Sequence, residues 1–417
     1  MARIVGGIGA SHSPTIGFAK DAHKEDDPAW APIFEGFGEV RRWVQEQDVD
    51  VLFMIYNDHI TSFFFDHYSA FALGVDDTYE AADEGGGPRD VPPATGHADL
   101  ARHIGASLMA DEFDMSFFRG RALDHGCLSP LSMMGDEDGP WPGAIVPLQV
   151  GVLQLPIPNA RRCWKLGKAL RRAVESYPED LRVAVVGTGG LSHQVHGERA
   201  GFVNEEWDTE FLRLIVEDPE KLVEMRIAEY AERGGMEGAE VVMWLIMRGA
   251  LSEKVRLVHS MTYAPSVTNI ATVVLEDLGD APDEALAAAH REHVGRELAG
   301  AEALAGTYPF TLARSAAGYR VNDFLHRLVE PEHRRRFLED FEALAEEHGL
   351  SEEERTLIRE RRWIEMVRSG VTFFVLEKMA AVLGIPNPQV YASMRGETLE
   401  EFQATRKVAL QYGVGRQ

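Results

Sequence analysis

Short apolar runs alternate with helical patterns over residues 1–275 of the chain. The runs are rich in Val, Ile and Leu and predict strands at Ala2–Gly9, Val49–Tyr56, Ala144–Leu155, Leu181–Gly187 and Val255–Tyr263. Helices are predicted between them at Ile33–Gln47, Ala98–Ala110, Arg161–Ser176, Asp208–Val216 and Gly238–Gly249. Such alternation is typical of an α/β fold, in which helices flank a central sheet that is mostly parallel or mixed. The segment Asp76–Gly96, full of Gly, Pro, Asp and Glu, predicts a long surface loop that could cover a site.

The C-terminal part of the chain has a different pattern. Residues 276–306 are rich in Ala, Glu and Gly and predict a linker with a helix in it, and from Thr307 onward every strong pattern is helical. One apolar helix face, ended by Gly349, is predicted from Phe337, Leu338, Phe341 and Leu344. Capping-box spacing predicts two further helix starts, at Ser351 with Glu354 and at Thr398 with Glu401. We therefore predict an α/β domain over 1–275, a linker over 276–306 and a small all-helical domain over 307–417.

Composition excludes several classes of protein. With 417 residues, 45% of them hydrophobic, the chain can bury a sizeable core, which excludes disorder. A net charge of -25 argues against binding to nucleic acid or to an anionic membrane. The two cysteines, Cys127 and Cys163, form no CxxC motif, and the sequence shows neither a signal peptide nor a membrane span. We expect a soluble, cytoplasmic enzyme.

Three histidines stand just past predicted strands: His12, His59 and His193. In open α/β sheets, ligands bind beyond the carboxyl ends of the strands, so these side chains could converge at a metal or acid–base site. A fourth, His125, lies in the turn-like Asp-His-Gly-Cys segment. Each has a structural alternative: His12 could cap a turn, His59 follows the turn formers Asn-Asp, and His125 could be purely structural. The glycines before His193 could bind phosphate, although no GxGxxG or Walker spacing is present.

A carboxylate could complete such a site. Glu237 and Glu240 precede a continuous apolar run, where a buried carboxylate without a counter-charge costs several kcal/mol. A metal ion would remove that cost. Two imidazoles and one carboxylate form the facial triad of non-haem Fe(II) oxygenases. The same ligands also suit a zinc hydrolase, although HExxH is absent.

Five separated motifs resemble one enzyme family. They are Ser11-His12-Ser13-Pro14, Tyr56-Asn57-Asp58-His59, Asp124-His125-Gly126-Cys127, Gly187-Thr-Gly-Gly-Leu-Ser-His193-Gln and Gly238-Ala-Glu240-Val-Val-Met-Trp-Leu-Ile-Met-Arg-Gly. In this order they resemble the catalytic β subunits of the type II (LigB-like) extradiol ring-cleavage dioxygenases. The helical tail, with Gly306-Thr-Tyr-Pro-Phe-Thr-Leu-Ala-Arg and Gly318-Tyr-Arg-Val-Asn-Asp-Phe, resembles the small α subunit of that family. Here β and α are fused in one chain, as in the family members that cleave gallate.

The resemblance implies a mechanism and residue roles. Position by position, it implies Fe(II) held by His12, His59 and Glu240, with His193 as the acid–base histidine and His125 as a second histidine near the substrate. It implies cleavage of gallate by O₂ beside its vicinal hydroxyls, to the open-chain product 4-oxalomesaconate. Alternative substrates are 3-O-methylgallate and protocatechuate. We lean to a homodimer, because the small tail could reach the active site of a partner subunit.

Several residues are weaker candidates for substrate binding. Glu377 stands where the related α subunit has serine, and an acidic acceptor there would suit a third ring hydroxyl, although Glu377 could equally be a surface residue. Neutral hydrogen bonds to the ring carboxylate could come from residues after the last predicted strand, where the register departs from the family by about one residue: Ser266, Thr268 and Asn269. The other candidates are Ser13, beside His12, and two aromatic lid residues, Tyr391 and Tyr412.

Overall fold

The computed structural model describes residues 1–135, 139 and 141–408 of the chain. Two compact units form, Met1–Arg296 and Glu297–Gln417. Among the described residues, no helix is long and apolar enough to cross a membrane. The first unit carries the sheet and the second is helical, so an α/β fold with a helical C-terminal region is confirmed.

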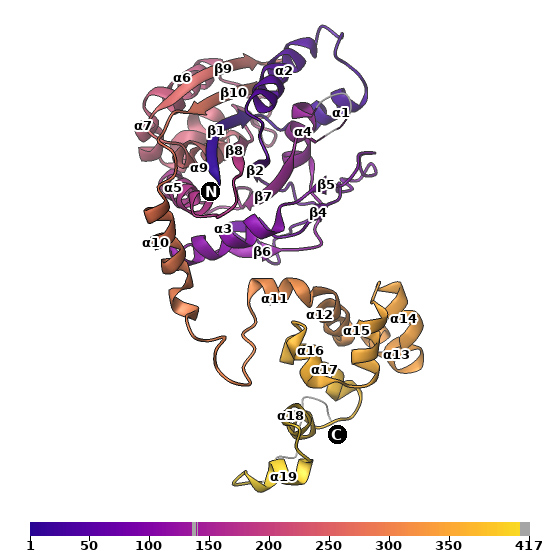
Figure 1. Cartoon of the computed structure of the whole chain (residues 1–417). Coiled ribbons are helices and arrows are strands. Elements are labelled where there is room, and N and C mark those ends of the chain that lie inside the picture. The colour runs from indigo at the N-terminus through magenta and orange to yellow at the C-terminus, as the bar shows by residue number, and fades with distance from the viewer. Residues whose placement is uncertain (136–138, 140, 409–417) are drawn as a thin grey trace. The chain divides into compact units, whose positions relative to one another are not determined.

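The described residues of the first unit build a mixed eight-stranded sheet in the order β6-β3-β7-β2-β8-β1-β10-β9 (Figure 1). The strands are β1 Arg3–Ala10, β2 Val51–Tyr56, β3 Phe71–Gly74, β6 Ser116–Phe118, β7 Ala144–Val150, β8 Arg182–Thr188, β9 Val255–Tyr263 and β10 Ile270–Asp277. The central strands β7, β2, β8 and β1 run parallel to one another. The pairs β3–β7, β1–β10 and β10–β9 are antiparallel, which makes the sheet mixed. Because the central strands are buried on both faces, they are almost continuously apolar.

Helices cover both faces of this sheet (Figure 1). One face packs against α1 Pro14–Asp21, α2 Ala31–Glu46 and α4 His125–Met134. The other packs against α3 Ala98–Ala110, α5 Ala160–Glu175, α6 Glu205–Glu217, α7 Pro219–Glu224, α8 Ile227–Gly234 and α9 Val242–Ala250. A 3₁₀ turn, η1 Glu237–Val241, leads into α9, and α10 Glu284–Gly295 and η2 Arg296–Leu298 follow the sheet.

The sheet topology places the functional motifs at one edge. Strands β1, β2 and β8 are parallel, with β8 between the other two, so their carboxyl ends lie side by side. They end at Ala10, Tyr56 and Thr188, and the histidine-bearing turns follow directly. The prediction that Val255–Tyr263 is the last strand was wrong: β10 follows it and lies between β9 and β1. The Asp76–Gly96 segment includes a short pairing of β4 Thr78–Tyr79 with β5 Ala94–Thr95.

The second unit is a set of short helices around its own apolar core. They are α11 Leu312–Ala317, α12 Tyr319–His326, η3 Arg327–Val329, α13 Pro331–Glu339, α14 Phe341–Glu347, α15 Glu352–Arg359, α16 Trp363–Arg368, α17 Phe373–Val382, α18 Asn387–Arg395 and α19 Leu399–Ala404. Both predicted capping boxes are confirmed, at Ser351 and Thr398. The single helix predicted over Phe337–Leu344 was wrong, because Asp340 ends α13 and caps α14.

Candidate metal centre and active site

His12 is held in place by the two strands that flank β1. The backbone N–H of Ser11 donates to the carbonyl of Ala271 on β10, and the N–H of Ala271 donates back to Oγ of Ser11. The imidazole of His12 is buried, and its Nδ1 lies 2.9 Å from Oγ1 of Thr188, the last residue of β8. This contact leaves Nε2 as the free nitrogen of His12, 3.3 Å from Oε1 of Glu240.

His59 is oriented by a buried carboxylate. Oδ2 of Asp124 accepts from the backbone N–H of His59 at 2.7 Å and lies 2.9 Å from its Nδ1. Oδ1 of Asp124 accepts from the N–H of Gly126 and so caps α4. Since a carboxylate only accepts, Nδ1 of His59 carries the proton and Nε2 carries the lone pair that can bind a cation. Nε2 lies 3.3 Å from Nδ2 of Asn57. Burial alone would raise the pKa of Asp124, but the hydrogen bond and charge of His59 outweigh it and lower that pKa.

Glu240 is 4% exposed and lies in η1, just before α9. Its Oε1 accepts from the N–H of Gly190 at 2.7 Å. Gly189, with φ +97°, passes so close that a Cβ there would lie 2.9 Å from Oε1, so only glycine suits this position. Burial would raise the pKa of Glu240, but the charge and hydrogen bond of His12, together with the charges of His193 and His59, hold it well below its ordinary value.

One ligand atom from each of His12, His59 and Glu240 lies within 4.8 Å of the other two. Two imidazole nitrogens and a buried carboxylate that meet in this way are the donor set of a divalent transition-metal site. A cation would offset the cost of burying the Glu240 carboxylate. Glu237, the other carboxylate considered, turns away: it accepts from the N–H of Val195 and pairs with His196. The residues present therefore fit a metal ion.

His193 lies beside this cluster without being one of its three members. Its Nδ1 donates to the carbonyl of Leu191 at 2.8 Å, and because a carbonyl only accepts, the proton is on Nδ1. Nε2 then carries the lone pair and lies 3.8 Å from Oε1 of Glu240. Ser192, the residue before His193, is anchored by the buried Asp208 through both its N–H and its hydroxyl. The geometry suits a histidine that accepts and returns a proton.

His125 is the first residue of α4, and its ring stacks on that of His59, with centroids 4.0 Å apart and planes at 27°. The ring centroid of His12 is 6.0 Å away. His59, Asp124 and His125 also form a group that could hold a metal. However, the oxygens of Asp124 are already used by the N–H groups of His59 and Gly126 and by the His59 ring. We therefore infer that Asp124 and His125 surround the first cluster and that no second metal site forms among these described residues.

The substrate-binding candidates of the first unit lie around the same turns. Ser13 follows His12, and its hydroxyl lies 2.8 Å from that of Thr15. Thr268 forms a backbone bridge with His193, and Ser266 is exposed in the turn between β9 and β10. Asn269 is 1% exposed and donates to Asp208 at 2.8 Å, while its Oδ1 is buried without a partner among the described residues.

The remaining candidates belong to the second unit. Glu377 on α17 is half-buried and accepts a hydrogen bond from Asn387 on α18. The ring of Tyr391 lies between those of Phe373 and Phe402, at centroid distances of 5.4 and 6.0 Å. Tyr412 lies outside the described residues.

Sequence reasoning missed the residues that orient the histidines. Asp124 stands in a quoted motif without an assigned role, although an Asp just before a helix is a familiar N-cap signal. Thr188 and Glu84, which contact His12 and His125, come from segments distant in sequence. No local pattern could have paired them with those histidines.

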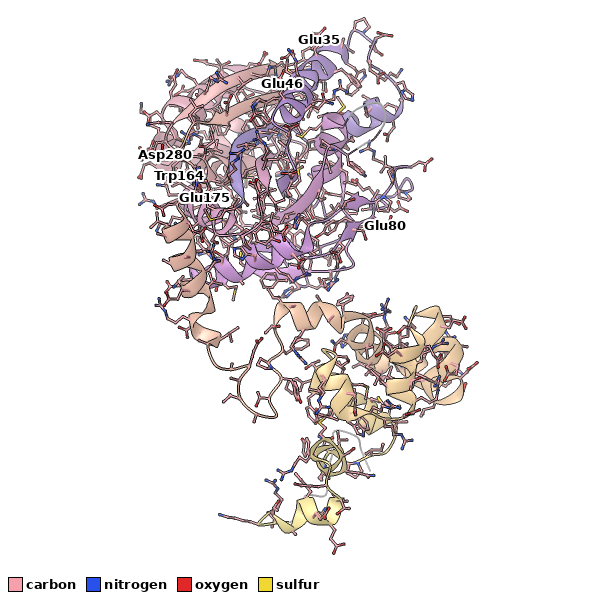
Figure 2. The ribbon with its side chains drawn as sticks, viewed as in Figure 1. Glu35, Glu46, Glu80, Trp164, Glu175 and Asp280 are labelled. Atoms are coloured by element: carbon pink, nitrogen blue, oxygen red, sulfur yellow. The ribbon has the colours of Figure 1, made fainter. Side chains whose placement is uncertain are left out.

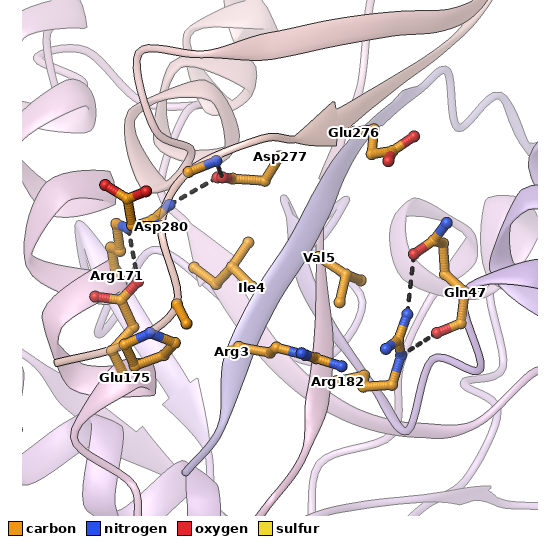
Figure 3. A pocket seen from close by; sticks show the side chains of 13 residues that line it. Arg3, Ile4, Val5, Gln47, Arg171, Glu175, Arg182, Glu276, Asp277 and Asp280 are labelled. Atoms are coloured by element: carbon orange, nitrogen blue, oxygen red, sulfur yellow. Dashed lines mark hydrogen bonds and ion pairs between the residues drawn. The ribbon is translucent and has the colours of Figure 1, made fainter. Parts of the chain in front are cut away.

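A separate cavity of about 270 Å³ lies at the other end of the strands, beside the start of β1 and the end of β10 (Figure 3). Two of the arginines that line it are engaged: Arg171 pairs with Glu175 and Asp277, and Arg182 bonds to Gln47. Since β1 begins at Arg3 in this cavity and ends at Ala10 beside the histidines, the two places are a full strand apart.

Comparison with known families defines the class of protein. Residues 6–275 match the family described as the catalytic LigB subunit of aromatic ring-opening dioxygenase. Residues 321–407 match the LigA subunit of the aromatic-ring-opening dioxygenase LigAB. The chain therefore belongs to the LigB family and is an aromatic ring-cleaving dioxygenase, a metal-dependent class of enzyme. This favours the dioxygenase over the zinc hydrolase considered from the ligand set.

Individual relatives narrow the comparison. Gallate dioxygenase of Pseudomonas putida is 62% identical over 333 residues, which cover 80% of this chain and 98% of that protein. A 2,3-dihydroxyphenylpropionate/2,3-dihydroxicinnamic acid 1,2-dioxygenase of Photorhabdus laumondii is 24% identical over 290 residues, which cover 59% of this chain and 87% of that protein. Among solved structures, an uncharacterized protein of Escherichia coli K12 is 10% identical with a TM-score of 0.40, covering 66% of this chain and 99% of that one.

Proposed function

We propose that this chain is an Fe(II)-dependent extradiol dioxygenase that opens the aromatic ring of gallate beside its vicinal hydroxyls. The proposal that gallate is the substrate rests on the 62% identity to a gallate dioxygenase across nearly the whole of that relative. The proposed product is the open-chain 4-oxalomesaconate, with both oxygen atoms of O₂ incorporated. 3-O-methylgallate and protocatechuate are the alternative substrates.

In this proposal His12, His59 and Glu240 hold the iron. Two neutral ligands and one carboxylate leave a divalent site with a net charge of about +1, which favours an anionic, hydroxylated aromatic acid. Three protein ligands also leave coordination positions free. Fe(II), when bound there, supplies the redox chemistry that allows O₂ to react with a ring bearing adjacent hydroxyls.

His193 is the proposed acid–base residue. Its Nδ1 proton is tied to Leu191, so Nε2 has the lone pair that can accept a phenolic proton from the bound ring. The protonated imidazole then returns a proton as the ring opens. His125, stacked on His59, is proposed as a second contact to the substrate.

The other proposed contacts and assembly follow the family pattern. Ser13, Ser266, Thr268 and Asn269 are proposed for the ring carboxylate and its surroundings, and Glu377, Tyr391 and Tyr412 for the third hydroxyl and a lid. We also propose a catalytic domain over 1–275, a linker over 276–306 and a helical domain over 307–417. The enzyme is proposed to act in the cytoplasm as a homodimer.

An oxygen-electrode assay tests the function. Protein loaded anaerobically with Fe(II) is mixed with air-saturated buffer and gallate, 3-O-methylgallate or protocatechuate. We expect rapid uptake of O₂ with gallate and a product that gains both atoms from ¹⁸O₂. Zinc-loaded protein is the matched control and should consume no O₂. Absence of uptake with all three substrates would contradict the proposal, and a faster reaction with another substrate would reassign its preference.

A further inference from the structure

Glu84 binds His125 at two points. Its Oε1 accepts from the backbone N–H of His125 at 2.9 Å, and its Oε2 lies 2.5 Å from Nδ1 of the same residue. We propose that Glu84 is a positioning residue for ring cleavage, acting by fixing the imidazole of His125. This inference rests on the proposed function and adds to it a residue outside the five motifs.

Two contacts together define the orientation of the His125 ring. Stacking on His59, with centroids 4.0 Å apart, fixes the plane of the ring, and the bond from Nδ1 to Glu84 fixes its rotation within that plane. Because a carboxylate only accepts, Nδ1 carries the proton. Nε2 has no hydrogen-bond partner among the described residues, so it is the nitrogen available to a ligand.

The loop that carries Glu84 is itself anchored. Before Glu84, the N–H of Ala82 donates to the carbonyl of Leu123, and the N–H of Leu123 donates to the carbonyl of Glu80. After Glu84, Oδ1 of Asp83 accepts from two glycine N–H groups, which closes the turn. Arg89, further along, makes a two-point ion pair with Asp21 on α1. The turn that carries Glu84 is therefore fixed on both sides, and this holds the Glu84 carboxylate against His125.

A purely structural role would give a different result. Glu84 satisfies the backbone N–H of the first residue of α4, so it could serve only as an extra cap for that helix. A cap would affect stability, whatever side chain stands at position 125. If Glu84 is a positioning residue, its substitution lowers turnover, and it does so only while residue 125 carries its imidazole. The two roles are separable by a double-mutant cycle.

The experiment uses iron-loaded full-length protein in five forms: wild type, Glu84→Ala, Glu84→Gln, His125→Ala, and Glu84→Ala with His125→Ala. Glu80→Ala is the matched control, because Glu80 is an exposed carboxylate of the same loop (Figure 2). Bound iron, thermal unfolding, and kcat and KM for gallate are measured for each.

We expect Glu84→Ala to lower kcat about tenfold with iron content unchanged, as for other groups that orient a functional histidine. Glu84→Gln, which keeps an acceptor, should recover part of this loss. In the His125→Ala background, Glu84→Ala should change kcat by less than about twofold, because the ring it orients is gone. Equal loss in both backgrounds, or equal loss in Glu80→Ala, would overturn the proposal.

A second measurement is independent of turnover. In zinc-loaded protein with ¹⁵N-labelled histidine, assigned with His125→Ala, we expect a protonated Nδ1 on His125 whose proton signal is lost in Glu84→Ala. An unchanged signal in Glu84→Ala would overturn the proposal. If wild-type protein consumes no O₂ with gallate, the proposed function fails, while this spectrum still decides whether Glu84 fixes the ring.

Discussion

Each of the four histidines at the candidate metal centre has its Nδ1 held by a group outside the cluster of His12, His59 and Glu240. The partners are the Thr188 hydroxyl for His12, the Asp124 carboxylate for His59, the Leu191 carbonyl for His193 and the Glu84 carboxylate for His125. Three of these partners only accept, so they place the proton on Nδ1 and leave the lone pair on Nε2. The site is thus organised by a shell of acceptors that sets which nitrogen each ring presents.

Removal of a ligand should separate metal binding from proton transfer. We expect His12→Ala and Glu240→Ala to lose most of their bound iron, since each removes one of only three donors. His193→Ala should keep its iron and lose about 10²-fold or more in kcat, the usual contribution of a positioned acid–base group. Metal analysis and O₂ uptake on the same samples test this. Loss of iron in His193→Ala would contradict the assigned roles.

Asp124 offers a test of orientation with folding held constant. Asparagine is as good an N-cap as aspartate, so Asp124→Asn should leave the unfolding temperature near that of wild type. Asparagine has one acceptor oxygen, and when this oxygen keeps the cap bond from Gly126 its NH₂ group faces the two N–H groups of His59 and cannot accept from them. We therefore expect iron affinity to fall about 10- to 100-fold. Competition with a chelator measures that affinity. Asp124→Ala is the comparison, and it should also lose about 1 kcal/mol of stability with the cap.

Sequence alone could place the histidines but not their partners. His12, His59 and His193 are predictable because each follows a strongly apolar strand, and parallel strands end at one edge. Asp208 is different: it lies on α6, and its bonds to Ser192 and Asn269 depend on how that helix packs over the turn. Such pairings require the three-dimensional arrangement.

At the scale of elements, α5 and α9 cover the same face of the sheet and pack so closely that their backbones are in contact. A Cβ at Gly167 on α5 would lie 2.2 Å from the carbonyl oxygen of Ile246, and one at Gly249 on α9 would lie 2.6 Å from that of Trp164. The close approach of the two helices therefore depends on glycine on both sides. Since α9 follows directly from η1, this packing also fixes where Glu240 emerges.

Alanine should have opposite effects on stability at two helix glycines, Gly167 on α5 and Gly38 on α2. Gly167→Ala forces the helices apart and should destabilise the fold by about 1–3 kcal/mol. Gly38→Ala, within α2, meets only the end of the Arg41 side chain at 4.0 Å and should stabilise by about 0.4–1 kcal/mol. Urea unfolding of both variants measures the difference. If Gly167→Ala changed the free energy of unfolding no differently from Gly38→Ala, α5 and α9 could separate without cost, and the prediction would be wrong.

The elements that sequence predicted well are those whose pattern is complete within the segment. The helix predicted over Ala98–Ala110 is confirmed, because its apolar face and its length are both local features. The single helix predicted across Phe337 and Leu344 failed, since Asp340 ends one helix and begins the next. Strand β10 was missed although its apolar run, Ile270–Leu275, and the Pro265-Ser266 turn before it are both local signals in the sequence.

At the scale of the whole molecule, the chain divides after Arg296 into two units with separate apolar cores. Within the first, α10 packs against α3 and α5, so the part of the predicted linker that forms this helix is attached to the first unit. Residues 299–306 follow η2 as exposed turns with one partly buried position, Ala301. The composition change near residue 276 signals a change of unit without fixing the residue at which it occurs.

Limited proteolysis tests this division. Exposed segments with few packed side chains are the preferred sites of cleavage, so brief trypsin treatment should first cut near Arg296. Mass spectrometry should find two fragments that correspond to the two units. First cuts at arginines within either unit would contradict the division. Light scattering on intact protein tests the proposed homodimer, whose mass would be twice 46.3 kDa.

The cluster of His12, His59 and Glu240 has a consequence for the order of events during synthesis. The first donor leaves the ribosome more than 200 residues before the last, and β1 gains its β10 partner only after residues 270–277 have emerged. A growing chain cannot therefore complete the cluster until almost all of the first unit has been made. If these residues hold the proposed metal, an unfinished chain has no complete set of donors and can bind the ion fully only late in its synthesis.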